Sequence, residues 1–424
     1  SALIGLLAAG MWYRRSTHGL ERRLLLDHAR WLIADETVLV LQVPLETLAH
    51  AVGVLREAGE IPPVVFYLHP KRAAPAIGER KPGASLPLAQ LEDHARRLAA
   101  GHRLDPRPRP NKELLDRLER ARDGIHEACA DLSAAGRLEL SSPPVAEWIL
   151  DNEYAVEANS RDVQLNLPPR YYRRLPALAN PQGPGLPRIY GLAQELVSHT
   201  DLRLDREGIL AFAEAYQSVH ALTIGELWAY PQMLRIALIE GIQSLAAKAL
   251  TELREREFAA FWASRLMTVS RRDHHQLFAI MAELTKVQPS PTPYFASQLI
   301  DHLYDEGAAL GPVQAWLERV YRKPLGELNL REQNRQTRDQ ISVSNAFTSL
   351  RQLALLDWRH IFEELSRVEG VLRSDPAGVY PQMDFDTRDH YRRTVEGLAR
   401  GSGHAESEVA QRAIDMASRL AQEP

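Results

Sequence analysis

A carboxylate and an indole lie two residues apart in the stretch TIGELW, Thr223 to Trp228. An aromatic face can stack on a pyranose while carboxylate oxygens accept its hydroxyl protons, so Glu226 and Trp228 are candidates for contact with a sugar. The same stretch fits a capping box, in which Thr223 and Glu226 each accept a hydrogen bond from the other's amide. We expect this structural role for Glu226 and a core position for Trp228. The capping role alone predicts that Glu226→Gln changes stability by at most about 1 kcal/mol.

Aromatic and basic residues alternate in PPRYYRR, which contains Tyr171 and Tyr172. This composition suits contact with phosphate or nucleic acid. Arginine also forks onto carboxylates, and four acids precede the motif: Asp151, Glu153, Glu157 and Asp162. We therefore expect internal salt bridges from Arg170, Arg173 and Arg174, with contact to a phosphate-bearing ligand or a neighbouring domain as the alternative.

Two further motifs resemble metal sites. Asp384-Phe385-Asp386 is a D-x-D, but we expect it to begin a helix, with Asp386 or Thr387 as N-cap and Asp389 in the first turn. His274-His275 has no partner at metal-ligand spacing in the sequence and is expected at a helix start. The sequence contains no Gly-rich phosphate loop, P-loop, nucleophile elbow or zinc motif. Nothing in it therefore predicts a metal or cofactor site in this chain.

Helical periodicity dominates from residue 85 onward and predicts an all-α domain over 85–424. Without a fixed repeat period, we expect an irregular multi-helix array, either solenoid-like or an α/α toroid. The segment Pro231 to Leu250 is apolar nearly all round and should be buried. A polar stripe of Asn345, Thr348 and Gln352 should form a seam between helices. The predicted helices are Leu88–Gly101, Lys112–Ala135, Pro144–Leu165, Leu186–His199, Asp205–His220, Thr223–Thr268, Arg272–Lys286, Pro293–Glu306, Pro312–Arg322, Asn345–Leu372, Thr387–Arg400 and Ala405–Gln422.

Residues 1–80 have a different texture and are expected to be a membrane-proximal segment. Two β-branched runs, Val38–Val43 and Pro63–Leu68, flank a helical stretch and suggest either a small β-α-β unit or, because both runs are short and apolar, membrane-proximal or buried pieces of helix. Ala2–Trp12 is apolar but shorter than the about 20 residues that span a bilayer. It is either the end of a transmembrane helix, with the following arginines on the cytoplasmic side, or a short buried helix.

Composition is that of an ordinary globular protein: 424 residues, 45% hydrophobic and 25% charged, with a net charge of −4. The absence of a basic balance argues against a dedicated nucleic-acid binder. One cysteine, Cys129, cannot form an internal disulfide, which fits a reducing compartment.

Five sequence blocks together resemble the cyclic β-1,2-glucan synthase family, over roughly residues 85 to 420. That resemblance implies a bacterial inner-membrane enzyme that polymerises glucose from UDP-glucose, with a divalent metal, at the cytoplasmic face. It places this chain in the helical region that precedes the glycosyltransferase domain, so the catalytic residues are expected beyond Pro424. The blocks are WILDNEYAVEANSRDV, LPPRYYRRLPAL, SHTDLRLD, YQSVHALTIGELWA and DPAGVYPQMDFDTRDHYRRTVEGLA.

Two functions follow as hypotheses. In the first, the chain is a non-catalytic scaffold that packs on the transferase domain or guides β-glucan. Its contact candidates are Glu226, Trp228, Tyr171, Tyr172, Arg173, Asn152 and Glu153, with UDP-sugar contact as an alternative for the arginines. In the second, the chain is a glycoside-active α/α domain that pairs Glu226 with Glu153 or Glu157, since that chemistry needs two carboxyl groups about 5–10 Å apart. An open cleft with facing acids would separate the two.

Overall fold

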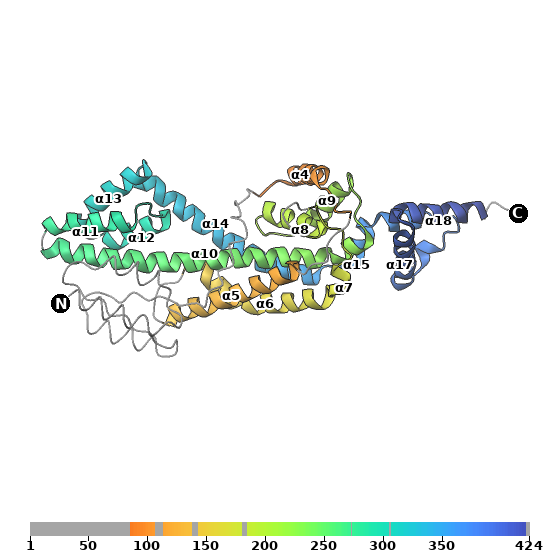
Figure 1. Cartoon of the computed structure of the whole chain (residues 1–424), viewed down its shortest axis with the longest axis horizontal. Helices are drawn as coiled ribbons and strands as arrows, with labels where there is room; N and C mark the ends of the chain where they lie inside the picture. Colours follow the sequence, from red (N-terminus) through yellow and green to blue (C-terminus); the bar gives the residue numbers. More distant parts are fainter. Residues whose placement is uncertain are drawn as a thin grey trace. The chain divides into compact units, whose positions relative to one another are not determined.

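The computed structural model describes residues 85–106, 113–137, 143–179, 185–272, 274–304 and 307–420 (Figure 1). Fifteen α-helices, α4 to α18, and one 3-10 helix make up this part of the chain, which contains no strand. Its only extended pairings are two isolated bridges, Leu104 with Leu178 and Ala177 with Pro187. The all-α prediction is confirmed. The predicted β-α-β unit and the apolar run Ala2–Trp12 lie outside the described residues.

The described residues divide into two compact units, and the predicted boundary near residue 80 stays a prediction. One unit comprises residues within 127–150 and 246–340. Its core packs Trp262 and Leu266 against Phe295 and Leu317. The helices that form only this unit are α11 (His274–Val287), α12 (Pro293–Leu303) and α13 (Gly307–Tyr321).

The second unit comprises residues within 85–126, 151–245 and 341–420, and it holds every candidate contact residue. In it α4 (Leu88–Gly101) packs on α8 (Arg188–His199) and α9 (Arg206–Gln217), as Figure 1 shows. Its other helices are α7 (Pro169–Tyr172), α15 (Trp358–Leu365), α16 (Arg367–Leu372), η1 (Tyr380–Gln382), α17 (Phe385–Ser402) and α18 (Glu406–Leu420). Four helices contribute residues to both units: α5 (Glu113–Arg137), α6 (Pro144–Asn166), α10 (Ile224–Arg272) and α14 (Leu325–Leu355).

Helix α10 provides the centre of the second unit. All residues from 231 to 242 are buried, as the apolar segment predicted, whereas the burial becomes one-sided from 243 onward. Pro231 lies inside the helix, beyond its first turn, so α10 lacks the amide bond that would otherwise reach the carbonyl oxygen of Leu227. Among the helices of the described residues, none has a stretch both long and apolar enough to cross a membrane.

The predicted helix Asn345–Leu372 is wrong, because this range contains the end of α14 and two shorter helices. Asp357 caps α15 by accepting from the amides of Arg359 and His360, and Ser366 caps α16 by accepting from the amide of Glu369. Short polar side chains of this kind start helices. Conversely, α14 begins at Leu325, twenty residues before the predicted start, in a segment too polar to show an apolar stripe.

A polar seam does lie on α14, but of its predicted members only Asn345 takes part, because Thr348 and Gln352 are exposed. Asp201 and Leu202 have left-handed backbone angles, with φ of 52° and 62°. Asn345 donates to the carbonyl oxygen of Asp201 at 3.1 Å, while the hydroxyl of Ser349 donates to that of Leu202 and accepts from the amide of Leu204, both at 2.8 Å. The seam therefore holds a turn that L-residues seldom adopt.

Candidate functional site

Glu226 lies in the first turn of α10 and is completely buried. The amide of Thr223 donates to its Oε2 at 2.9 Å, and the amide of Glu226 donates to the Thr223 hydroxyl at 3.2 Å. The predicted capping box is thus confirmed. Its geometry results from an oxygen-bearing side chain placed three residues before a glutamate.

A second partner of Glu226 could not be seen in the sequence. Arg188, at the start of α8, donates from Nε to Oε1 at 2.8 Å and from Nη2 to Oε2 at 2.5 Å. The same Nη2 also donates to the carbonyl oxygen of Ala221 at 3.0 Å. Both partners are nearly inaccessible to solvent, with side-chain exposures of 5% and 0%. Each carboxylate oxygen therefore has a charged donor, which leaves Glu226 occupied as a structural anion.

Two further side chains, Tyr216 and His102, extend the polar contacts of this ion pair. Arg188 lies over the ring of Tyr216, with its guanidinium carbon 5.9 Å from the ring centroid. The Tyr216 hydroxyl lies 2.8 Å from His102 Nδ1. Burial raises the pKa of Tyr216 to about 12, while burial and the Arg188 charge lower the pKa of His102. Near neutral pH both rings are therefore uncharged, and they do not compete for the carboxylate.

The start of α10 also receives a carboxylate from α18. Glu406 accepts from the amide of Ile224 at 2.8 Å, so a second free amide of the helix end is satisfied. Burial raises the pKa of Glu406 to about 7, against the hydrogen bond from Ile224. Glu226 and Glu406 thus both accept hydrogen bonds from amides at the start of α10.

Trp228 lies in an aromatic cluster. Its ring stacks on that of Phe362 with centroids 4.5 Å apart and meets Phe385 edge-on at 6.1 Å. The guanidinium of Arg392 covers both phenylalanines, at 5.1 and 4.7 Å from their centroids. The indole lies between α10, α15 and α17 with the face stacked on Phe362 covered, but it is only partly buried, so the expected core position is met in part.

The PPRYYRR motif forms α7 and separates its tyrosines from its arginines. Tyr172 is buried, and the Tyr171 hydroxyl donates to the carbonyl oxygen of Gly225, so both rings fasten α7 to the unit. Burial raises the pKa of Tyr171. Arg170, Arg173 and Arg174 are exposed.

The expected internal salt bridges of these arginines are wrong for the described residues, where no carboxylate pairs with them. The acids nearby have other partners. Glu153 lies 2.7 Å from His126, Glu157 lies 3.8 Å from Arg122 and Asp162 lies 3.4 Å from Arg235. These acids are therefore not the partners of the three arginines.

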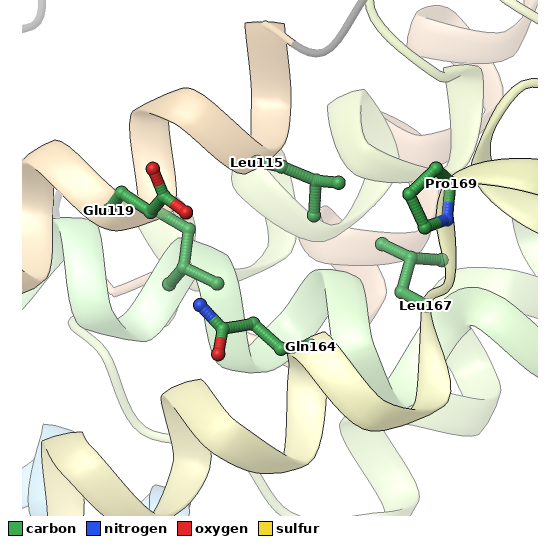
Figure 2. A pocket seen from close by; sticks show the side chains of 6 residues that line it. Leu115, Glu119, Gln164, Leu167 and Pro169 are labelled. Atoms are coloured by element: carbon green, nitrogen blue, oxygen red, sulfur yellow. The ribbon is translucent and has the colours of Figure 1, made fainter.

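A shallow hollow lies at the junction of α5, α6 and α7, and Pro169, which precedes these arginines in the sequence, is part of its lining. It measures about 220 Å³ and is lined by Leu115, Leu118, Glu119, Gln164, Leu167 and Pro169 (Figure 2). Its neighbour Leu165 is 80% exposed. The hollow is smaller than the about 300–1,000 Å³ of typical small-molecule sites. We call Leu165, the hollow and Arg170, Arg173 and Arg174 the junction surface.

The remaining candidates also have internal partners. Asn152 is 7% exposed and its side-chain oxygen accepts from Arg351 at 2.5 Å. Asp384, not Asp386 or Thr387, caps α17 by accepting from the amide of Thr387 at 2.7 Å. The D-x-D thus begins a helix as expected, but the N-cap lies two or three residues earlier than predicted. The side chains of His274 and His275 lie outside the described part.

Among the described residues, these contacts do not place a second acid opposite Glu226 across an open cleft. Glu226 is buried under Arg188, and Glu153 and Glu157 lie on α6 beside partners from α5. Glycoside hydrolysis needs two carboxyl groups on opposite sides of one bond. The geometry around Glu226 therefore favours the scaffold hypothesis over the hydrolase hypothesis.

Comparison with known proteins agrees with the sequence resemblance. No protein-family model matches the chain. The chain is homologous to a region of the cyclic beta-(1,2)-glucan synthase NdvB of Rhizobium meliloti (strain 1021), with 34% identity over 313 residues. The match covers 73% of this chain and 10% of NdvB, so the chain spans about a tenth of the length of that relative.

Proposed function

We propose that this chain is a non-catalytic helical region of a bacterial cyclic β-1,2-glucan synthase, where it docks against the glycosyltransferase domain of the same polypeptide. The parent enzyme makes its glucan from UDP-glucose at the cytoplasmic face of the inner membrane. UDP-glucose and the divalent metal bind outside this chain. The homology to a part of NdvB supports the parentage.

The observation that carries the non-catalytic role is the occupation of Glu226. A general acid or base must reach the substrate to within hydrogen-bond distance. Glu226 is fully buried, and its oxygens already accept from Arg188 and Thr223. Exposing Glu226 to a substrate would break its buried ion pair with Arg188 and remove the cap of α10. Its carboxylate therefore supports the fold and not the reaction.

The junction surface is the docking face in this proposal. It combines the small hollow with the exposed Leu165, which follows the lining residue Gln164 in the sequence, and with three exposed arginines that follow the lining residue Pro169. Interfaces between domains commonly have an apolar centre and are enriched in arginine. Tyr171 and Tyr172 fasten α7, which carries Arg170, to the unit. An acidic face of the transferase domain, with one apolar side chain to enter the hollow, would complement it.

Charge reversal tests this docking face. We expect the triple variant Arg170→Glu, Arg173→Glu and Arg174→Glu of the full-length synthase to lose about tenfold or more of its ring-forming activity, since like charges across an interface cost several kcal/mol. The KM for UDP-glucose should stay unchanged, because the arginines do not touch the nucleotide. The measurement is cyclic glucan formed by membranes that contain equal amounts of enzyme.

The matched control reverses three exposed arginines away from the junction surface, Arg97, Arg319 and Arg412. This variant carries the same change in net charge and should retain wild-type activity. If both triple variants behave alike, the junction surface is not the docking face. A raised KM for UDP-glucose in the first variant would instead assign the arginines to the UDP-sugar.

A further inference from the structure

Two histidines and a glutamate converge where α4 packs on α8. Glu195 and His199 are one turn apart on α8 and so share a face, and His94 reaches them from α4. Oε2 of Glu195 lies 2.9 Å from His94 Nε2 and 3.5 Å from His199 Nδ1. The two imidazole rings are 4.2 Å apart between centroids. One ligand atom from each residue lies within 4.8 Å of the other two.

These separations are close to those around a tetrahedral metal ion: 3.5 Å fits directly, and the 2.9 Å between His94 and Glu195 would open by about 0.4 Å or more. Zinc bonds of about 2.0–2.2 Å to nitrogen and oxygen place ligand atoms about 3.3–3.6 Å apart. Two imidazole nitrogens and one carboxylate oxygen are a common zinc set with an open fourth position. The three side chains are 22%, 38% and 26% exposed, so an ion and a water molecule can reach them from solvent.

We propose that His94, Glu195 and His199 bind one zinc-type transition-metal ion that joins α4 to α8. His199 Nδ1 lies 3.0 Å from the carbonyl oxygen of Glu195, which can accept a hydrogen bond from an Nδ1–H in the metal-free protein. With metal at Nδ1, that hydrogen bond is exchanged for the metal bond and the ring proton resides on Nε2. The site rests on these contacts and does not depend on the function proposed above.

The ligand set also indicates which metals fit. Magnesium and calcium prefer six or more oxygen ligands, whereas imidazole suits zinc, copper, nickel and cobalt. Glu195 supplies the single carboxylate of this cluster. The site is therefore unsuited to the magnesium-like metal that assists transfer from a nucleotide diphosphate. Its effect would be structural, because α4 contributes the buried Leu91, Ala95 and Ala99 to the unit.

Other histidines of the same unit supply internal comparisons. His102, two turns along α4 from His94, is paired with Tyr216. His404 lies 3.4 Å from Glu408 at the same four-residue spacing as His199 and Glu195. Among the described residues, no third ligand joins that pair. A histidine and a glutamate at this spacing can thus be compared with and without the third residue.

The experiment is a zinc titration of the tag-free, chelator-treated chain, followed by calorimetry and by thermal unfolding. We expect one ion per chain and a rise in Tm of about 5 °C or more when free zinc is 100 times the Kd. Cobalt should give the visible absorption bands of a tetrahedral site. Magnesium at the same concentration should not change Tm.

Three variants locate the site. His94→Gln and His199→Gln should each weaken zinc binding by more than about tenfold, the lower bound set by losing even an outer contact of a metal site. His404→Gln should bind zinc as the unchanged chain does. Far-UV circular dichroism confirms that each variant is folded. Absence of binding in the unchanged chain, or equal binding in all three variants, would overturn the proposal, since zinc would then bind elsewhere among the 15 histidines.

Discussion

Arg188→Ala is expected to lower the free energy of unfolding by about 3–5 kcal/mol, because it leaves the buried Glu226 carboxylate without its charged donors. Arg188 donates hydrogen bonds to both carboxylate oxygens of Glu226 and also to the carbonyl oxygen of Ala221. Urea denaturation followed by circular dichroism measures the loss. Hydrogen exchange should show faster opening at the amides of α8 and at the start of α10.

The matched control is Arg206→Ala. Arg206 also forms a 2.5 Å ion pair, with Glu364, but its side chain is 46% exposed. Exposed pairs contribute about 0–1 kcal/mol. A further variant, Arg188→Met with Glu226→Leu, should recover much of the lost stability, because it removes both buried charges together. Equal losses for Arg188→Ala and Arg206→Ala would contradict this account of the buried pair.

Glu369→Ala is expected to cost about 3–5 kcal/mol for the same physical reason. Glu369 is completely buried and accepts from Arg373 Nε at 2.9 Å, Arg392 Nη1 at 2.8 Å and the Tyr380 hydroxyl at 2.7 Å. Removal leaves the fully buried Arg392 guanidinium without this partner. Its aromatic neighbours Phe362 and Phe385 cannot replace a carboxylate.

This second pair also has a defined pH dependence. Burial alone would raise the pKa of Glu369, but the hydrogen bonds from Tyr380, Arg392 and Arg373 outweigh it and hold the pKa below its usual value. A lowered folded-state pKa means that the contribution is fully present above the ordinary pKa of glutamate and is lost as pH falls through the lowered value. The difference in stability between Glu369→Ala and the unchanged chain should therefore shrink on acidification. Glu396→Ala, which breaks the pair with Arg400, whose side chain is 53% exposed, is the control and should cost under about 1 kcal/mol.

Local patterns predicted much of the fold. The helix Leu88–Gly101 was placed with both ends correct, and the buried segment of α10 was found from its apolar composition. The start of α14 was missed because Arg331–Gln340 is polar nearly throughout, so its helical conformation depends on packing and ion pairs. The breaks at Asp357 and Ser366 were missed because apolar periodicity continues across them.

The candidate site was predicted less well because its contacts link distant residues. The capping box of Thr223 and Glu226 spans three residues and was visible in the sequence. The Arg188 partner lies 38 positions away, and nothing in its own neighbourhood distinguishes it from a surface arginine. The same holds for His94, which is 101 positions from Glu195. The exposure of Arg170, Arg173 and Arg174 was missed because nearby acids in the sequence turned out to have other partners.

The central claim is that Glu226 serves the fold and does not act on the glucan. The buried Arg188 raises the expected cost of Glu226→Gln above the about 1 kcal/mol that capping alone implies, since an amide cannot balance the guanidinium charge. It should nevertheless leave the chemistry intact at temperatures where the variant stays folded.

The direct measurement is cyclic glucan formed by the full-length synthase with Glu226→Gln, scaled to the amount of folded enzyme. We expect activity within about threefold of wild type together with a lowered melting temperature, because the loss of charge acts on stability. Activity below about one hundredth of wild type with unchanged melting would contradict the account, because a carboxylate that acts as acid or base is worth a factor of about 10² or more.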